Sequence, residues 1–354
     1  MNILLQIIFY FFVSLLTLIF IVQTYLALPR KFKTTYAGKY APKTLVIVPS
    51  RGTDYSMTEN LKSIKYQKCE NFSVLCVVDS EDDPSVKNIK EADLDYIIST
   101  YRSSGSGKVR AIATALDKFR DFEVYVVADT DIRARPDWLV NLIRPLSLKN
   151  YGLATTFPYF KSVGNFWSKF KTVWGFVGRG MMESKITVFG WGGSMAFRKD
   201  LIEGKIGEFA QDVSDDMAIT RICKERGLHI AYVPEASPEI YSPDDWGTFK
   251  EWSIRQTSLL VSRNKTAFTI GILLYGSMSL LIVASLVFGA IISPIFFLWL
   301  IPLILSEIKI STRLREHKIW YYLSGIIMPF FYTWNLYRAR KTESITWRGV
   351  RYKL

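Results

Sequence analysis

Two aspartates two residues apart directly follow an apolar stretch of the chain. The stretch 123–128 is rich in β-branched residues, which is typical of a buried strand, and it runs into Asp129 and Asp131. Side chains at positions i and i+2 of an extended chain point the same way, so both carboxylates can converge on one divalent cation. We predict that this pair binds Mn²⁺ or Mg²⁺ and a diphosphate. An exposed, helix-capping pair of acids ahead of Pro136 is the alternative.

Two other polar segments follow earlier apolar stretches. The first holds Pro49, Gly52 and Asp54, where the glycine permits a tight turn into a helix whose amino end favours an anion. The second runs from Asp79 to Asp83, and its acids can accept hydrogen bonds from a base or a ribose. An ordinary turn explains the first segment equally well, and a run of acids such as the second is more often a solvated loop.

Two segments further along the chain also carry charge at the start of a helix. Lys108 ends a Gly-Ser-Gly-Lys sequence that lacks the spacing and the following Ser or Thr of a Walker loop, although the lysine can still contact a diphosphate. Ser214, Asp215 and Asp216 open a second helix, where the helix dipole stabilises acids. Beside a diphosphate site, Asp216 can instead serve as a general base for an incoming hydroxyl.

Composition excludes several other kinds of protein and site. A chain of 354 residues with 49% hydrophobic residues buries enough apolar surface to fold. Its two histidines and three cysteines show no spacing of a zinc site, a Ser-His-Asp triad or a disulfide framework, so catalysis is expected to rest on carboxylates. The net charge of +13 indicates an anionic partner. We expect membrane lipid and no nucleic acid, because much of the excess base flanks apolar segments.

The elements that must position these residues alternate between strands and helices. Apolar runs at 45–48, 72–78, 95–99 and 123–128 alternate with helical patterns at 57–66 and 109–119. This rhythm predicts an α/β domain with a mainly parallel sheet. Ligands bind at the carboxyl ends of the strands in such sheets, and the acids described above follow those ends.

Apolar segments at both ends of the chain predict membrane helices. The uncharged stretch 3–28 is long enough to cross a bilayer, and Arg30, Lys31 and Lys33 place its end in the cytoplasm. A cleaved signal peptide is the alternative, but no basic residue precedes the stretch. Two further spans are expected at 268–292 and 294–306.

The last apolar segment, 320–337, differs from the others. It contains a central proline and is followed by several cations, which a simple span would carry to the outer side against the positive-inside rule. We therefore expect a re-entrant or interfacial segment rather than a third C-terminal span.

The order of these motifs resembles glycosyltransferase family 2, with its GT-A fold, and within it the ceramide glucosyltransferase group. The resemblance runs from about residue 43 to residue 256 and resumes at the C-terminus. The motifs that carry it are Gly52-x-Asp54 with Glu59-Asn60-Leu61, Asp82-Asp83-Pro84, Asp129-x-Asp131, the Gly192-Gly193 to Arg198-Lys199-Asp200 stretch, Ser214-Asp215-Asp216 and Thr346-Trp347-Arg348-Gly349.

The resemblance implies a role for individual residues. It implies that Asp83, or in second place Asp79, helps to hold the uridine of a UDP-sugar, that Asp129 and Asp131 bind metal and diphosphate, and that Asp216 is the catalytic base. The residues expected to bind the donor are Pro49, Gly52, Asp79, Asp83, Lys108, Asp129 and Arg255. Of the family's membrane-proximal Gln-x-x-Arg-Trp motif, only the arginine is retained here, as Arg255.

The resemblance also implies an organisation and a function. We expect an N-terminal transmembrane anchor (1–29), a cytosolic GT-A domain (30–265), C-terminal membrane segments (266–337) and a basic cytosolic tail (338–354). The expected activity is inverting transfer of a hexose, glucose in first place, from a UDP-sugar to a lipid hydroxyl by an integral membrane protein. The alternatives are transfer to polyprenyl phosphate, processive polysaccharide synthesis, and a catalytically inactive membrane scaffold.

Overall fold

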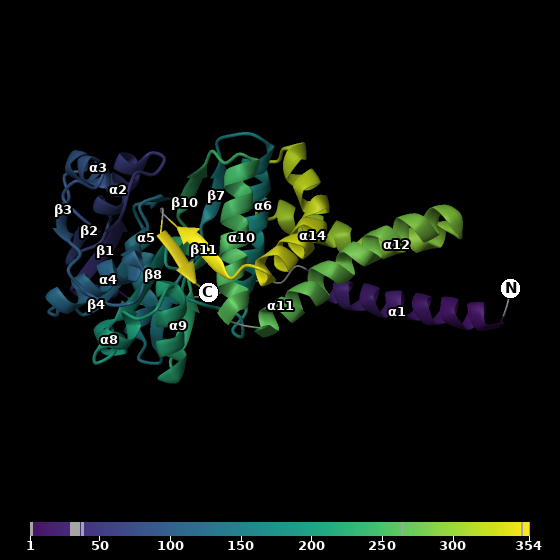
Figure 1. Cartoon of the computed structure of the whole chain (residues 1–354), viewed down its shortest axis with the longest axis horizontal. Coiled ribbons are helices and arrows are strands. Elements are labelled where there is room, and N and C mark those ends of the chain that lie inside the picture. The colour runs from purple at the N-terminus through teal and green to yellow at the C-terminus, as the bar shows by residue number, and fades with distance from the viewer. Residues whose placement is uncertain (1–2, 29–35, 37–38, 264, 348–349, 354) are drawn as a thin grey trace.

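The protein consists of a globular part and a long helical arm, which carries the N-terminus at its far end (Figure 1). The computed structural model describes residues 3–28, 36, 39–263, 265–347 and 350–353. The cations Arg30, Lys31 and Lys33 lie outside the described residues, as do Arg348 and Gly349 of the C-terminal motif.

A seven-stranded sheet forms the centre of the globular part. Its strands are β1 (Thr44–Ser50), β2 (Phe72–Val78), β3 (Asp95–Ile98), β4 (Val124–Ala128), β6 (Tyr151–Thr155), β8 (Ser194–Arg198) and β9 (His229–Tyr232), in the order β3-β2-β1-β4-β8-β6-β9. Strands β3, β2, β1 and β4 are parallel, and so are β6 and β9, whereas β8 runs antiparallel to both of its neighbours. The predicted α/β fold with a mostly parallel sheet is thus confirmed.

Helices cover both faces of this sheet. In β1, Val46 and Val48 face one buried cluster and Leu45 and Ile47 face the other, because successive side chains of a strand point to opposite faces. The first cluster is completed by α2 (Met57–Lys65), α3 (Ser85–Glu91) and α5 (Trp138–Ile143). The second is completed by α4 (Gly107–Lys118), α7 (Lys199–Ile202), α8 (Ile206–Phe209) and α9 (Asp215–Glu225).

A smaller sheet and three helices connect the globular part to the arm. The sheet contains β5 (Ile132–Arg133), β10 (Glu239–Ser242) and β7 (Tyr159–Ser162), with β10 in the middle. The helices are α6 (Phe166–Met182), α10 (Trp246–Arg263) and α14 (Ile319–Arg340). Phe170, Phe249 and Phe331, one from each helix, have ring centroids 5.1 to 5.5 Å apart, so aromatic packing joins the three helices into one body.

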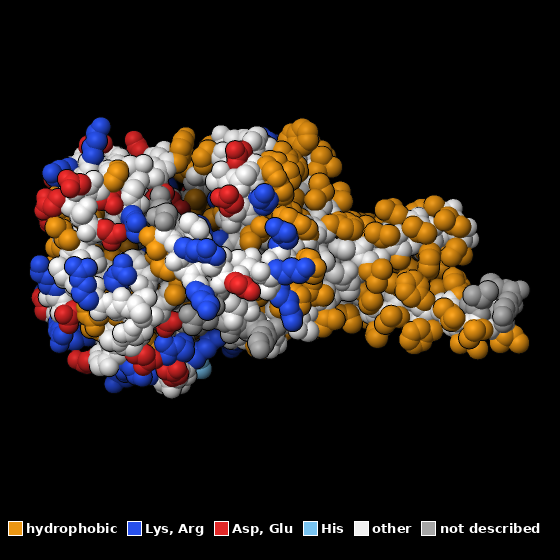
Figure 2. All heavy atoms as spheres, in the orientation of Figure 1, with side chains coloured by type: hydrophobic (Ala, Val, Ile, Leu, Met, Phe, Trp, Pro, Cys, Tyr) orange, Lys and Arg blue, Asp and Glu red, His pale blue; other side chains and the backbone are white. Residues whose placement is uncertain are grey.

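The arm is almost entirely apolar on its surface (Figure 2). It consists of α1 (Ile3–Ala27), α11 (Lys265–Gly271), a π-helical segment (Ile272–Gly276), α12 (Ser277–Ile291), a 3₁₀ segment (Pro294–Leu300) and α13 (Ile301–Ser311). Among the described residues, three segments are long and apolar enough to cross a membrane: Gln6–Ala27, Thr266–Ile291 and Pro294–Ser311. The buried Gln23 ties the first to the second, since its Nε2 donates to Leu274 O at 2.7 Å and to Ser277 Oγ at 2.8 Å.

The C-terminal region begins with α14, a single helix that continues through Pro329 as far as Arg340. After it, β11 (Ser344–Trp347) and β12 (Val350–Lys353) pair as an antiparallel hairpin.

Candidate active site

Three elements and one loop bring a buried lysine together with acids at one edge of the large sheet. Asp129 and Asp131 follow the end of β4, and Asp215 opens α9. Lys108, in the first turn of α4, places its Nζ 2.7 Å from Asp129 Oδ1 and 3.2 Å from Asp215 Oδ2. The same Nζ donates to Gly192 O at 3.1 Å. Two carboxylates and one carbonyl therefore surround this ammonium group, although Asp215 Oδ2 makes only the ion pair and accepts no hydrogen bond among the described residues.

The charge of Lys108 is fixed by these partners. Burial alone would lower the pKa of this amine, but the Asp129 and Asp215 carboxylates raise it above its usual value. The loop at Gly192 must approach closely to complete the arrangement. A Cβ added at Gly192 would lie 2.4 Å from Asp215 Oδ2 and 2.9 Å from Lys108 Nζ, so only glycine fits there without a displacement of the pair.

Asp131 is an acid whose negative charge has few stabilising contacts. Its Oδ1 is buried and has no hydrogen-bond partner among the described residues. Burial, followed by the negative charges of Asp129 and Asp54, raises the pKa of Asp131 to about 7. Asp54 itself accepts a hydrogen bond from the Thr130 hydroxyl. The site therefore concentrates negative charge that a cation would neutralise.

The donor set at this edge fits a divalent cation that shares its ligands with a substrate. Carboxylate oxygens are ligands that Mg²⁺ and Mn²⁺ prefer, and the orphaned Asp131 Oδ1 offers one. Among the described residues, no three His, Cys, Asp or Glu side chains are grouped closely enough to hold a metal ion by themselves. Magnesium in proteins is usually bound by one or two carboxylates plus substrate phosphates, which is the arrangement this geometry allows.

Asp216 lies next to Asp215 but has different partners. Its Oδ1 accepts hydrogen bonds from the Ser214 hydroxyl and from Met217 N–H, the latter at 2.7 Å. Burial and the neighbouring Asp215 charge raise the pKa of Asp216 to about 6. A carboxylate with such a pKa is close to the value at which a general base works best near neutral pH.

The predicted nucleotide-binding residues lie beside this cluster at the ends of β1 and β2. Gly52 has a positive φ of 66° and donates its N–H to Asp83 Oδ1 at 2.9 Å. The same oxygen accepts from Ser85 N and Oγ, so Asp83 fixes the loop before α3. Asp79 is exposed and pairs with Arg51 at 3.2 Å. Pro49, in β1, is in register with Val77 of β2.

A second buried ion pair, formed by residues outside the predicted motifs, lies on α6 and before α10. Lys171 of α6 and Asp244, just before α10, are each 9% exposed and lie 2.5 Å apart. The Lys171 ammonium also lies 4.3 Å from the centroid of the Trp252 ring, and its charge acts on Asp131. Arg255 lies on α10 three residues after Trp252, in a half-buried position. The only signal in the sequence was a pair of lysines, Lys169 and Lys171, within the aromatic segment 166–176, far from any acid motif.

We expect Lys171→Met to destabilise the fold by about 3–5 kcal/mol, because it leaves the Asp244 carboxylate buried without its cation. Asp244→Asn should lower the thermal unfolding midpoint in the same way. The double variant should recover much of the loss, since neither charge then remains alone. Thermal unfolding of the four proteins forms a double-mutant cycle. Losses that simply add in the double variant would show that the two residues do not act as a pair.

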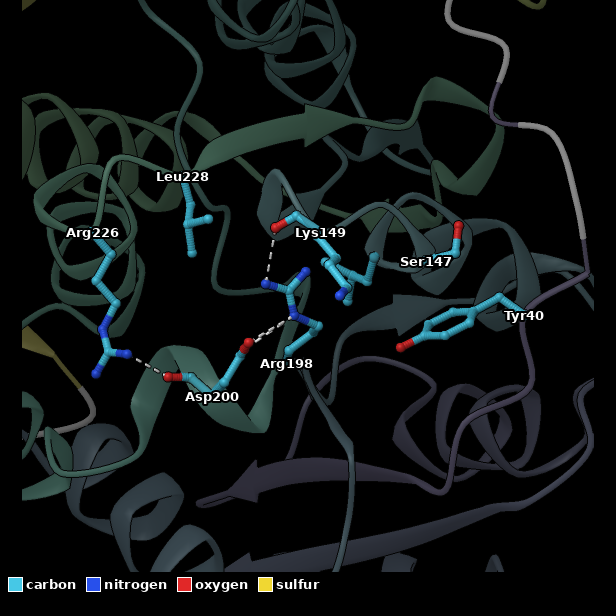
Figure 3. Close-up of a pocket in the computed structure, with 8 residues that line it drawn as sticks. Tyr40, Ser147, Lys149, Arg198, Asp200, Arg226 and Leu228 are labelled. Atoms are coloured by element: carbon cyan, nitrogen blue, oxygen red, sulfur yellow. Dashed lines mark hydrogen bonds and ion pairs between the residues drawn. The ribbon is translucent and has the colours of Figure 1, made fainter.

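A pocket of about 830 Å³ lies at the opposite edge of the sheet (Figure 3). Its two arginines, Arg198 and Arg226, already bind carboxylate and backbone oxygens of the protein. Arg198 pairs with the Asp200 carboxylate at 3.0 Å, and Arg226 donates to Asp200 O at 2.6 Å and to Glu203 O at 2.9 Å. Arg198 is in register with Val124 at the start of β4, whereas the acid cluster follows the end of that strand. These residues therefore brace the fold rather than belong to the acid cluster.

Comparison with known proteins identifies relatives of this arrangement. A family model described as Glycosyl transferase family 21 matches residues 9–354. The fold is similar to that of mannosyltransferase PcManGT from Pyrobaculum calidifontis, solved in complex with GDP-Man and Mn²⁺, with a TM-score of 0.58 and 17% identity over 93% of this chain and 95% of that one.

More distant similarity extends to other solved structures. A mycobacterial protein matches with a TM-score of 0.45 and 17% identity, over 66% of this chain and 80% of that one. Glucosyl-3-phosphoglycerate synthase from Mycobacterium tuberculosis, in complex with Mn²⁺ and UDP-glucose, matches with a TM-score of 0.40 and 14% identity, over 63% and 79%. The predicted GT-A fold is confirmed.

Proposed function

The chain belongs to glycosyl transferase family 21, and from this premise we propose that it is an inverting membrane enzyme that transfers a hexose, glucose in first place, from a UDP-sugar to a lipid hydroxyl. The predicted resemblance to a nucleotide-sugar glycosyltransferase is confirmed at the level of the family and the fold. The observation that carries the proposal is the cluster of Asp129, Asp131, Asp215 and Lys108 at the carboxyl edge of the sheet, with Asp216 beside it.

The residues at this edge would divide the work of binding the donor. Asp129 and Asp131 would hold the diphosphate through Mn²⁺ or Mg²⁺, and PcManGT, with the same fold, was solved with Mn²⁺. The cation, when bound, would offset the negative charge of the diphosphate. Asp83 keeps the Gly52 turn in place, so the exposed Asp79 is the freer of the two acids to reach the uridine. Pro49, Lys108 and Arg255 complete the set that we assign to the donor.

Asp216 would remove the proton from the acceptor hydroxyl. As that proton moves to the Asp216 carboxylate, the hydroxyl oxygen forms a bond to the anomeric carbon and the bond from this carbon to the diphosphate breaks. The electron pair of the broken bond leaves with the nucleoside diphosphate. Attack from the opposite face inverts the anomeric centre. Lys108 would stay protonated throughout, because it is held between Asp129 and Asp215.

The apolar arm supports a lipid acceptor. Its three apolar segments would enter the membrane, with the catalytic domain on the cytosolic face. Phe170, Phe249 and Phe331 join α14, which contacts the arm, to α10 and α6, and α6 carries Lys171, whose charge acts on Asp131. These packed helices would thus form a rigid connection between the membrane surface, where the lipid hydroxyl lies, and the acids of the site.

The proposal can be tested by expressing the full chain in a host that lacks such glycolipids and analysing its lipids by mass spectrometry. We expect a new hexosyl lipid whose linkage survives mild acid. A product that mild acid cleaves would point to transfer onto a polyprenyl phosphate instead. Purified enzyme should consume UDP-glucose faster than UDP-galactose, UDP-GlcNAc or GDP-mannose. No consumption of any nucleotide sugar would indicate an inactive scaffold.

A further inference from the structure

Helix α14 has two apolar faces, of which only one is covered. The inner face contains Tyr321, Met328, Phe331, Tyr332 and Leu336, all buried. The outer face carries eight large apolar side chains spaced along one side of the helix, each between 37% and 63% exposed. We call them the outer stripe: Ile319, Trp320, Leu323, Ile326, Ile327, Phe330, Trp334 and Tyr337.

The outer stripe cannot turn inward, because the inner face is fixed to the globular part. The Asn335 amide Nδ2 donates to Thr257 Oγ1 at 2.9 Å and to Ser253 O at 3.2 Å, both on α10. Tyr332 stacks on Trp174 of α6 with ring centroids 5.9 Å apart. Eight exposed apolar side chains on a helix held in one orientation therefore need a partner outside the described chain.

The position of α14 identifies that partner. The helix lies where the arm meets the globular part, and the apolar surface of the arm continues onto it (Figures 1 and 2). It also contacts the apolar segments directly: Leu336 packs over Gly271 at the end of α11, and Glu307 of α13 packs over Gly325. The outer stripe is thus continuous with the surface that would face lipid.

The ends of α14 carry the residues that suit a membrane surface. Lys318 precedes the helix, and Arg338, Arg340 and Lys341 close it. Trp320, Trp334 and Tyr337 lie just inside these cations, where amphipathic rings prefer the headgroup level. Within the described residues, α14 is not among the segments long and apolar enough to cross a membrane.

We propose that α14 lies flat in the boundary between headgroups and acyl chains, with its outer stripe immersed and its terminal cations on anionic headgroups. A helix of this type is immersed by about 5–10 Å along its whole length. The partner is therefore the lipid leaflet itself. The inference does not depend on the proposed glycosyl transfer, since it uses only the exposure, packing and charge of α14. It decides between the interfacial and re-entrant alternatives for residues 320–337.

Depth measurement on the full chain in vesicles tests this. Single cysteines at Leu323, Ile327 and Phe330, in a Cys69→Ser background, would carry an environment-sensitive fluorophore. The vesicles contain phosphatidylcholine and phosphatidylglycerol with a quencher attached near the headgroup or deep in the acyl chain. We expect the shallow quencher to act more strongly than the deep one at all three positions. Leu148→Cys, exposed beside the pocket at the far edge of the sheet, is the matched control and should not be quenched by either.

Three results would overturn the proposal. If the deep quencher acts more strongly at one position and the shallow quencher at the others, the segment is a span or a re-entrant turn. Shielding from water without quenching by lipid would indicate that a second copy or another protein covers the outer stripe. Free exposure to water at all three positions would show that the stripe has no partner. Thermal unfolding of each labelled variant checks that the fold is retained.

Discussion

Replacing Asp131 by asparagine should reduce glycosyl transfer by about 10²–10³-fold or more, the range for loss of one preorganised charge-stabilising group. The change keeps the volume of the side chain and removes one negative charge from a site where burial, Asp129 and Asp54 disfavour it. In metal-free protein the substitution should therefore leave the thermal unfolding midpoint unchanged or raise it. Wild-type protein should gain stability on addition of Mn²⁺, and the variant should gain much less.

The comparison with Asp129 makes this test specific. Asp129→Asn also removes an ion-pair partner of the buried Lys108, so it should lower both activity and stability. Asp95→Asn, which changes an exposed acid at the start of β3, is the control and should change neither. A Mn²⁺-induced stabilisation of Asp131→Asn equal to that of the wild type, or full activity in excess chelator, would remove Asp131 from the metal site.

Asp216→Asn should lower the rate of transfer by about 10²–10⁴-fold while UDP-sugar affinity stays within a few-fold, because a general base acts on the acceptor. The asparagine oxygen can still accept hydrogen bonds from the Ser214 hydroxyl and Met217 N–H, so the start of α9 should remain intact. Donor titration and initial rates at saturating lipid measure the two effects separately.

The pH dependence of the transfer rate is an independent test of Asp216 as the general base. With a pKa of about 6, the Asp216 carboxyl takes up a proton as the pH falls below that value, and the base is then lost. The wild-type rate should fall by about tenfold per pH unit on the acid side, and this limb should be absent in the residual activity of Asp216→Asn. If the variant retains more than about a tenth of the wild-type rate, Asp216 is not the base, and Asp215→Asn should be measured next.

The local pattern of the sequence predicted the frame of the site well. The strand before Asp129 and the helices at 57–65 and 107–118 occur where apolar runs and helical periodicity placed them. Three apolar segments of the arm also match the expected spans in length and composition. These features depend on neighbours in the chain, which a sequence displays directly.

Features that depend on distant parts of the chain were not predictable in this way. The direction of β8 is not encoded in its apolar residues, and the antiparallel strand inserted between β4 and β6 brings Gly192 under Asp215 and Lys108. The bridge from Lys108 to Asp129 and Asp215 spans more than a hundred residues. Nor does the sequence show that Asp83 is engaged by Gly52 and Ser85, because those hydrogen bonds form only once the turn is folded.

The hydrogen bonds of Gln23 bear on attempts to shorten the chain. Removing α1 to obtain a soluble fragment would take away the amide that donates to Leu274 O and Ser277 Oγ, beside the π-helical segment of the arm. It would also uncover Leu281 and Trp299, which pack with Leu16. The remaining hydrophobic hairpin would then lack both a polar partner and a packing face. In a fragment intended for crystallisation in water, the segment from α11 to α13 is better removed together with α1 than left without it.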